Sequence, residues 1–287
     1  MILKEKKKEE KFMRKKLKYD LHTHTSYSDG DLDILGNVKN AIKLGLDGIA
    51  ITDHDNIDGW EEIDNNTYKI DVLKGVELST YYKGDSVHVL GYYLNDGGDY
   101  SELDSFLKKT REERLVRVKK IIELLKQYDI DVTYEEILAE ADGAVARPHI
   151  AKAIIKKYPE RGYTSTYLFD NYIGNDRPCY LPVNYFDTRD AIKLLKRNHC
   201  LVVIAHPLLI TKFDYKELAK YEIDGIEAIY NYQSDIKNDV LSFTLNNKLI
   251  VTGGSDYHGP VTRDSMGSVY LEGKYVYDFL DKINKNK

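Results

Sequence analysis

Short apolar runs recur along the chain, and most of them end in polar residues that can take part in chemistry. Seven runs have the length and the β-branched content of strands. They cover residues 18–24, 48–55, 72–79, 87–94, 200–207, 225–231 and 249–258. Helical patterns separate several of them, for example over residues 34–45 and 188–198. This alternation predicts an α/β fold with a mostly parallel sheet that is closed or nearly closed.

Residues 100 to about 185 interrupt this alternation with a mainly helical pattern. Over residues 101–128 apolar side chains return every three or four positions, with one longer gap at Arg111, which predicts an amphipathic helix. Thr133 and Glu136 have the spacing of a helix capping box. Pro148 can occupy the first turn of a further helix. These helices predict an insertion between two parts of the sheet.

Composition and charge narrow the class of protein. With 42% hydrophobic and 31% charged residues, the chain is typical of soluble globular proteins, and no apolar run approaches the roughly 20 residues that cross a bilayer. The charged residues 1–18 lack the apolar stretch of a secretory signal, so we expect a cytoplasmic protein without a membrane partner. The net charge of −5 argues against broad capture of long nucleic acid. Cys179 and Cys200 are not at metal-binding spacing, and we expect both to be inert.

Candidate metal ligands lie where the predicted strands end. Alternate residues of a strand face the same side, so His22 and His24 point together, and Asp256 and His258 repeat this spacing. One such pair is more often structural than functional, but two pairs at strand ends favour a site. Six of the eight histidines lie at or beside strand ends, namely His22, His24, His54, His88, His206 and His258. Most of the six should meet, because these ends share one face of a parallel barrel.

His88 fits this rule less simply, because it comes early in its apolar run. A strand that runs in the opposite direction, or a short loop before the strand, would account for its position. His199 precedes its strand and should therefore lie at the opposite rim, where we expect a structural role.

Three carboxylates accompany the histidines, at Asp29, Glu77 and Asp256. Imidazole with carboxylate is a ligand set for Zn²⁺, Mn²⁺ or iron, whereas a closed structural zinc site usually contains thiolates. Nine candidate ligands are too many for one ion, so we expect two or three divalent ions. Such a cluster is net positive and suits phosphate, because paired ions can activate a bridging water for in-line attack. Asp53 and Asp55 are better suited to orienting a ligand than to binding a metal.

The insertion offers a complementary anion site. Arg147 and His149 stand at a predicted helix start, where free N–H groups favour anions, and Arg can hold a phosphate through two hydrogen bonds. The alternative is that Arg147 is a surface cap and His149 a packed helix residue. Glu227 ends another strand, and we expect it to have a structural or ligand-orienting role.

Eight motifs, taken in order, carry a resemblance to a known family. They are "DLHTHTSYSDG", "ITDHD", "GVELS", "HVLGYYL", "ARPHIA", "VIAHP", "GIEAIYN" and "GGSDYHG". Over residues 18 to about 270 this set resembles the PHP family, the polymerase and histidinol phosphatase phosphoesterases. The resemblance implies a distorted seven-stranded (βα) barrel, similar to a TIM barrel, with a trinuclear metal site at the carboxyl ends of its strands.

The resemblance also implies how the ligands are shared among three ions. The first ion would be held by His22, His24, Glu77 and Asp256. The second would share Glu77 and add His88 and His206. The third would take Asp29, His54 and His258. Arg147 and His149 would bind the substrate phosphate.

The motifs are most similar to the branch of the family that acts on nucleotides. This branch includes phosphatases of nucleoside monophosphates and 3′,5′-bisphosphates, and some members trim short RNA from the 5′ end. We therefore predict a phosphoesterase that hydrolyses such phosphomonoesters through a metal-bridging hydroxide, with short RNA as a further substrate. Aromatic side chains of the insertion are available to stack on a base, namely Tyr163, Tyr167, Phe169 and Tyr172.

The sequence leaves three alternative functions open. Within the same class, the protein could be a histidinol-phosphate phosphatase. In a different class, it could be a non-catalytic, metal-stabilised interaction module, although that reading predicts lost ligands. A nucleic-acid binder that uses the charged N-terminal arm is a third reading, and it predicts salt-dependent affinity.

The length of 287 residues suits a single α/β barrel that carries an insertion, although two domains of unequal size would also fit. We expect a charged extension over residues 1–18, a barrel domain over residues 19–99 and 186–287, and a mainly helical insertion over residues 100–185 that caps the active site.

Overall fold

The computed structural model describes residues 15–64, 67–94, 98–141, 145–181, 186–232, 234–260 and 265–284, with the backbone alone for residues 234–237. Most of the predicted N-terminal extension, residues 1–14, lies outside the described residues. None of the described helices is both long enough and apolar enough to cross a membrane.

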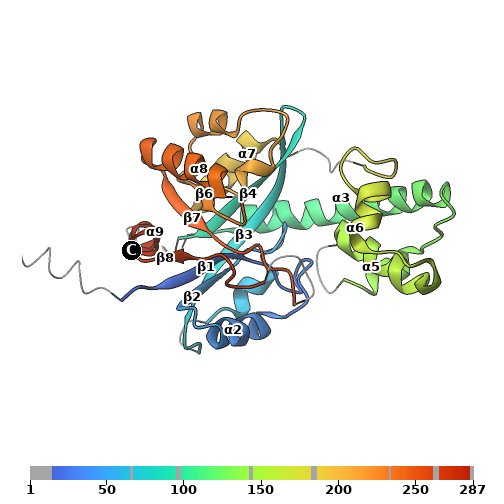
Figure 1. Ribbon diagram of the computed structural model, residues 1–287, viewed down its shortest axis with the longest axis horizontal. Coiled ribbons are helices and arrows are strands. Elements are labelled where there is room, and N and C mark those ends of the chain that lie inside the picture. The colour runs from blue at the N-terminus through green and yellow to red at the C-terminus, as the bar shows by residue number, and fades with distance from the viewer. Residues whose placement is uncertain are drawn as a thin grey trace, which may run out of the picture.

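Within the described residues, the strands form an eight-stranded mixed sheet in the spatial order β7-β6-β5-β4-β3-β2-β1-β8 (Figure 1). The strands are β1 (Lys18–Thr23), β2 (Gly48–Ile51), β3 (Asp71–Tyr82), β4 (Asp85–Tyr93), β5 (Cys200–Ile204), β6 (Gly225–Ile229), β7 (Ile250–Gly253) and β8 (Leu271–Glu272). The first seven correspond to the seven predicted apolar runs. The count of seven was one short, because β8 has two residues and leaves no periodic pattern in the sequence.

Strand direction explains the position of His88. β4 runs antiparallel to both β3 and β5, whereas the pairs β1–β2, β2–β3, β5–β6 and β6–β7 are parallel. The start of β4 therefore lies beside the carboxyl ends of its neighbours, and His88 pairs with Ser79 of β3. The expectation of a strand of opposite direction is correct.

The two ends of the sheet approach each other, so that it is nearly closed. Thr23 at the end of β1 pairs with Tyr257, four residues after β7. The amide of His24 donates to the carbonyl of Tyr257 at 2.8 Å. This confirms the predicted α/β fold with a nearly closed, barrel-shaped sheet.

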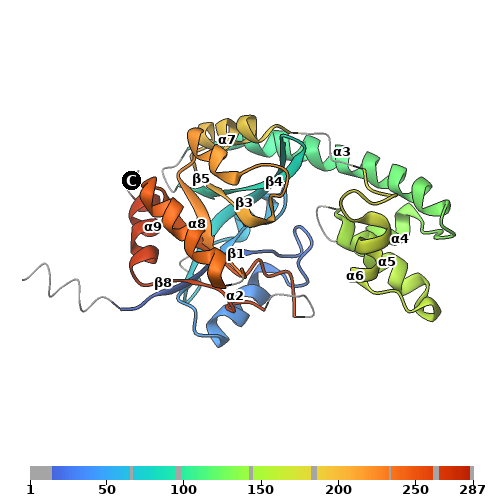
Figure 2. The ribbon, with the colours of Figure 1, turned by 45° about the horizontal axis from the view of Figure 1, so that its top comes forward.

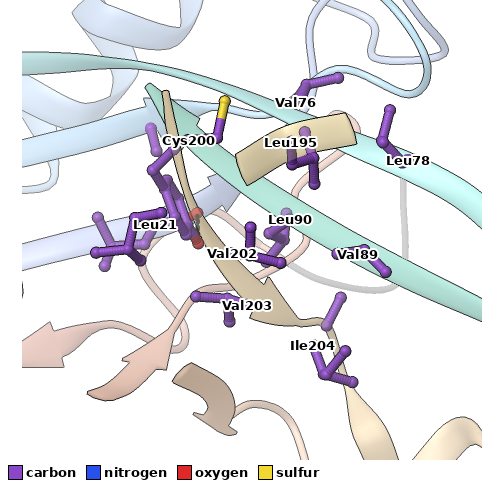
Figure 3. Packing of buried hydrophobic residues seen from close by; sticks show 14 of the residues in the cluster. Leu21, Val76, Leu78, Val89, Leu90, Leu195, Cys200, Val202, Val203 and Ile204 are labelled. Carbon is purple, nitrogen blue, oxygen red and sulfur yellow. Dashed lines mark hydrogen bonds between the residues drawn. The ribbon is translucent and has the colours of Figure 1, made fainter. Parts of the chain in front are cut away.

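In the described part of the chain, four helices lie around the sheet, namely α2 (Ile34–Lys43), α7 (Thr188–Arg197), α8 (Ser234–Asn246) and α9 (Lys274–Asn284) (Figures 1 and 2). Leu195 of α7 packs on the face of the sheet that carries Val76 and Gly91 (Figure 3). A Cβ atom at Gly91 would lie 2.6 Å from the Leu195 side chain, so glycine permits this close approach. The main hydrophobic core thus extends from the strands to the surrounding helices.

The long helix α3 (Ser101–Lys126) leads from the sheet into a separate group of helices (Figure 2). This group contains α4 (Tyr134–Leu138), α5 (Arg147–Lys157) and α6 (Ser165–Leu168). Short 3₁₀ helices lie at η1 (Asp58–Glu62), η2 (Pro159–Arg161), η4 (Pro207–Leu209) and η5 (Tyr215–Lys220), and a short π-helix lies at η3 (Phe169–Ile173). The capping box of Thr133 and Glu136 is present at the start of α4, as predicted.

α3 contributes to two hydrophobic clusters. Leu103 and Leu107 are buried in the main core, whereas Val118 and Leu125 are buried in a second cluster with the helices of the insertion. The gap in the apolar pattern at Arg111 is the point where the helix passes from one core to the other. The predicted amphipathic helix is present, and the two halves of its buried stripe face different partners.

Candidate metal centre

The nine predicted metal ligands converge at one end of the sheet. Three of the ligands lie within strands, namely His22 in β1, Glu77 in β3 and His88 in β4, and His24 follows β1 directly. The loops after β1, β2, β5 and β7 carry the others, namely Asp29, His54, His206, Asp256 and His258. Neighbouring imidazole rings have centroids 4.0 to 5.8 Å apart, with His24 and His258 stacked at 4.0 Å. Side chains from far-separated segments thus form one cluster.

Glu77 is fully buried, and its carboxylate lies within 3.3 Å of five imidazoles. Its Oε1 lies 2.8 Å from His88 Nδ1 and 3.0 Å from His206 Nε2. Its Oε2 lies 3.0 Å from His54 Nδ1, 3.2 Å from His22 Nε2 and 3.3 Å from His24 Nε2. A carboxylate in this position can be shared between ions on either side of it.

The other two carboxylates lie on different sides of the cluster. Asp256 Oδ1 lies 3.1 Å from His24 Nε2 and 3.3 Å from His22 Nε2. Asp29 Oδ1 lies 3.3 Å from His258 Nε2. The short segment from His22 to Asp29 therefore contributes to two different groups of ligands.

Within the described residues, three groups have potential ligand atoms within 4.8 Å of one another. They are His22, His24, Glu77 and Asp256; His24, Asp29, His54 and His258; and His54, Glu77 and His88. The first equals one ligand set that the resemblance implies, and the second contains another. His206 contacts Glu77 but joins none of these groups, and His54 takes its place beside Glu77 and His88.

Several ligand atoms are buried without a hydrogen-bond partner among the described residues. They are His22 Nε2, His24 Nδ1, Asp29 Oδ1, His54 Nδ1 and Glu77 Oε2. Buried polar atoms in proteins are normally paired, and each exception needs an explanation such as an ion. Coordination to a divalent cation would satisfy such atoms, so these residues fit a multinuclear metal centre.

The pKa values in the cluster show how its charges compensate without metal. Burial alone would raise the pKa of Glu77, but His54, His22 and the other imidazoles hold this pKa well below its usual range. Burial would lower the pKa of His258, but the charge of Asp29 raises it to about 10. For His88 burial prevails, and its pKa is lowered. Protons on the imidazoles therefore balance the carboxylates, and metal ions would have to displace them.

The loops of this cluster contain strained backbone and one close approach between backbone segments. Asp55, His206 and Asp256 have φ values of 46°, 25° and 55°, in the left-handed region that non-glycine residues rarely adopt. A Cβ atom at Gly254 would lie 2.4 Å from the amide nitrogen of His22. Glycine at this position lets the loop with Asp256 and His258 lie directly against β1.

A cavity of about 260 Å³ lies between the ligand cluster and the insertion. From the barrel it is lined by Asp29, His54, Ser79, Ser86, His88 and His258, and from the insertion by Arg114, Arg117, Ala146, Arg147, Pro148, Phe169 and Tyr180. The guanidinium of Arg147 lies 5.2 Å from the ring of Tyr180 and 5.6 Å from that of Phe169. The cavity therefore combines potential metal ligands with three arginines and two aromatic rings.

The two predicted substrate-binding residues lie in different environments. Arg147 lines the cavity, and it also donates to the carbonyl of Ile173 at 3.1 Å. His149 is buried and accepts the amide of Ala146 through Nδ1 at 2.9 Å, which caps the start of α5. Since His149 is not among the described residues that line the cavity, its position favours the packed-helix alternative.

Comparison with known proteins assigns the family. The sequence profile of the PHP domain matches residues 20–170, which is more than half of the chain. The chain belongs to the PHP domain family. Its nearly closed mixed sheet is typical of the distorted, TIM-like barrel of this family, and its residues provide a cluster of the kind that binds metal in PHP phosphoesterases. The protein is therefore a metal-dependent phosphoesterase.

Three proteins that are similar to this chain in sequence act on different substrates, as their names state. A 5′-3′ exoribonuclease of Haemophilus influenzae is 29% identical over 85% of this chain and 90% of its own length. A phosphoribosyl 1,2-cyclic phosphate 1,2-diphosphodiesterase of Eggerthella lenta is 26% identical over 85% and 95%. A 3′,5′-nucleoside bisphosphate phosphatase of Chromobacterium violaceum is 27% identical over 84% and 87%. The relatives agree on phosphoester chemistry and not on one substrate.

A solved structure supports the same PHP fold over nearly the whole chain. A Bifidobacterium adolescentis protein, provisionally described as a metal-dependent phosphoesterase, superposes with a TM-score of 0.82. It is 27% identical in sequence, and the match covers 93% of this chain and 96% of that one. The insertion is therefore part of the shared architecture.

Some residues around this PHP site were not predicted. Arg114, Arg117 and Tyr180 line the cavity, but nothing in their spacing marks them as site residues. The interruption of the apolar stripe at Arg111 was the one available signal that this stretch of α3 meets something other than a core. Of the four aromatic residues expected to form a base platform, Phe169 lines the cavity.

Two buried carboxylates lie next to the candidate ligands, and one of them, Glu227, contacts two of these ligands directly. Glu227 Oε1 lies 3.0 Å from His22 Nδ1, and its Oε2 accepts the amide of His206 at 2.8 Å. Asp53 accepts the amide and the hydroxyl of Thr25, both at 2.7 Å. Neither carboxylate belongs to the three ligand groups found among the described residues. In this PHP protein they hold the strands and loops that present the ligands.

Proposed function

We propose that this protein hydrolyses phosphomonoesters of nucleotides, acting on nucleoside monophosphates or 3′,5′-bisphosphates and also trimming short RNA from the 5′ end. The observation that carries the proposal is the cavity between the ligand cluster and the insertion. One wall supplies imidazoles and a carboxylate, and the other supplies guanidinium groups beside aromatic rings. This pairing suits a substrate that has both a phosphate and a base.

The nine ligand candidates would hold two or three divalent ions, such as Mn²⁺, Zn²⁺ or iron. Divalent ions in such a cluster lower the pKa of a bound water and stabilise the charge on phosphate oxygens. Glu77 would be shared between ions, and Asp256 and Asp29 would serve opposite sides of the cluster. Glu227 Oε1 lies 3.0 Å from His22 Nδ1 and would accept its N–H, which would leave Nε2 of this histidine as the lone-pair donor to a metal.

The insertion would act as the cap that holds the substrate. Arg117 and Arg147 can each donate two hydrogen bonds to a phosphate, and burial of the cavity strengthens such bonds. Phe169 and Tyr180 offer faces on which a base can stack. His149 would contribute by fixing the first turn of α5, from which Arg147 extends.

The proposal is tested by measuring phosphate release with added Mn²⁺. The substrates are nucleoside monophosphates, 3′,5′-bisphosphates and 5′-phosphorylated short RNA, with histidinol phosphate as the alternative within the class. Phosphoribosyl 1,2-cyclic phosphate tests the diesterase activity of one relative. We expect the nucleotides to be turned over fastest, and His22→Ala to remove activity. Absence of nucleotide turnover by a protein with a full complement of metal would disprove the proposal.

A matched pair of arginine variants tests the role of the cap. Arg147→Met should raise KM for the nucleotide at least tenfold, because hydrogen bonds to a charged group contribute about 1.5 to 3 kcal/mol. Arg161→Met is the control, since Arg161 lies in the same insertion, stacks on Tyr158 at 4.3 Å and is exposed. Steady-state kinetics should separate the two variants. Equal KM values would contradict the assignment of Arg147.

A further inference from the structure

Two arginines on α3 bind the loop that follows β2. They lie at the point where the helix leaves the main core, three residues apart and so on one helix face. Arg114 Nη2 donates to the carboxylate of Asp55 and to Ser79 Oγ, the latter at 2.9 Å. Arg111 Nη1 donates to Asn56 Oδ1 at 2.9 Å. We name these contacts of Arg111 and Arg114 with the loop the α3 clamp.

The clamped loop carries a candidate ligand. His54 precedes Asp55 directly, and its Nδ1 lies 3.0 Å from Glu77 Oε2. Asp55 has a φ of 46° and is held on three sides. Its amide donates to the carbonyl of Glu77 at 3.0 Å, and its Oδ1 accepts the amide of Ser79 at 2.9 Å. Arg114 binds the remaining oxygen, Oδ2.

The central contact of the clamp is a buried ion pair. The side chains of Arg114 and Asp55 are 7% and 2% exposed. A buried ion pair adds little stability compared with apolar residues of the same volume, because removing both charges from water costs about as much as their attraction returns. Its physical effect is to fix geometry, here the geometry of a left-handed residue beside His54.

Arg114 also faces the substrate cavity. It lines the cavity together with His54, and its Nε is buried without a hydrogen-bond partner among the described residues. The same guanidinium therefore touches the insertion side of the cavity and the loop of the metal centre. α3 itself continues into the second hydrophobic cluster, so the clamp joins the insertion to the ligand loop.

We propose that Arg114, supported by Arg111, is a positioning residue that fixes His54 for metal binding through Asp55. The clamp thereby ties the placement of the insertion to the assembly of the metal centre. This inference rests on the proposed metal-dependent function, but it concerns metal affinity and does not depend on which phosphoester is the substrate.

The test is a calorimetric Mn²⁺ titration of metal-stripped protein, which requires no substrate. Arg114→Gln and Asp55→Asn should each weaken Mn²⁺ binding about 10- to 100-fold, as expected for residues that orient a ligand. The double variant should bind no more weakly than the worse single variant, because both changes break the same contact. Lys108→Gln is the control, since Lys108 is an exposed residue of α3 that pairs with Asp104 at 2.7 Å. Its Mn²⁺ affinity should equal that of the unsubstituted protein.

The alternative is that Arg114 contacts only the substrate. In that case Arg114→Gln would leave Mn²⁺ affinity unchanged and raise KM, and the proposal would be overturned. Additive losses in the double variant would overturn it as well, because Arg114 would then not act through Asp55. If Arg114→Gln alone fails to fold, Asp55→Asn and the double variant decide, since the double variant replaces the buried charges with two amides. Failure to find a substrate would leave these titrations unaffected.

Discussion

Glu227→Gln is the most direct test of how the protein prepares His22 to bind metal. The two oxygens of Glu227 accept from His22 Nδ1 at 3.0 Å and from the amide of His206 at 2.8 Å. A glutamine has one oxygen and one NH₂ group in place of these two acceptors. If its oxygen keeps the amide of His206, its NH₂ group faces His22 Nδ1. This nitrogen must then accept, and the proton moves to Nε2, the nitrogen that faces Glu77 and Asp256.

The expected magnitude follows from that tautomer change. An imidazole protonated at Nε2 has no lone pair for a metal there, and loss of an orienting carboxylate typically weakens metal affinity about 10- to 100-fold. This corresponds to about 1.4 to 2.8 kcal/mol of binding free energy. The fold should survive, because glutamine has nearly the volume of glutamate. Mn²⁺ titration measures the affinity.

Glu222→Gln provides the matched control, since Glu222 is exposed and lies shortly before β6, the strand that carries Glu227. We expect this control to bind Mn²⁺ as the unsubstituted protein does. A Glu227→Gln variant with unchanged Mn²⁺ affinity would refute the reasoning, because the second acceptor would then be unnecessary.

Two further predictions concern the metal-free cluster and its closest loop contact. Burial would lower the pKa of His258, but Asp29 raises this pKa from 6.5 to about 10. The stabilisation from this pair is therefore complete below pH 6.5 and is lost as the pH rises toward 10. The Tm of metal-stripped protein should fall over this range, and a Tm independent of pH would contradict the assignment. Gly254→Ala should lower stability by about 1 to 3 kcal/mol and weaken Mn²⁺ binding, because the added Cβ would meet the His22 amide at 2.4 Å. Thermal unfolding measures the stability, and titration measures the Mn²⁺ affinity. A variant in which both values are unchanged would show that the loop can move.

Most of the ligand cluster could be predicted because most of its members lie at the end of an apolar run. His22, His24 and His258 needed only the two-residue period of a strand and the rule that parallel strand ends share one face. His88 required knowledge of strand direction, which depends on how β3, β4 and β5 pair and is not written in the local sequence. The family resemblance implied His88 as a ligand without knowledge of how β4 pairs with its neighbours.

The substrate side of the site could not be predicted in the same way. Helical periodicity shows which side of α3 is buried, but not which part of the molecule covers it. Arg114 is buried and Arg117 lines the cavity, yet both read as ordinary charged residues of a helix. His149 was ambiguous for a related reason, since a histidine near a helix start can bind an anion or cap the helix, and its contact with Ala146 favours the second role.

The position of the cavity follows from the way α3 is shared between two cores. Leu103 and Leu107 anchor its first half in the main core, and Val118 and Leu125 anchor its second half in the insertion. Between them, residues 108–114 carry no apolar side chain, and this segment spans the joint between the two cores. Arg111 and Arg114 of this segment contact the loop that carries His54. An insertion carried on a single continuous helix thus places cationic side chains opposite the ligand cluster, and the α3 clamp uses the same helix face to hold one of the ligand loops.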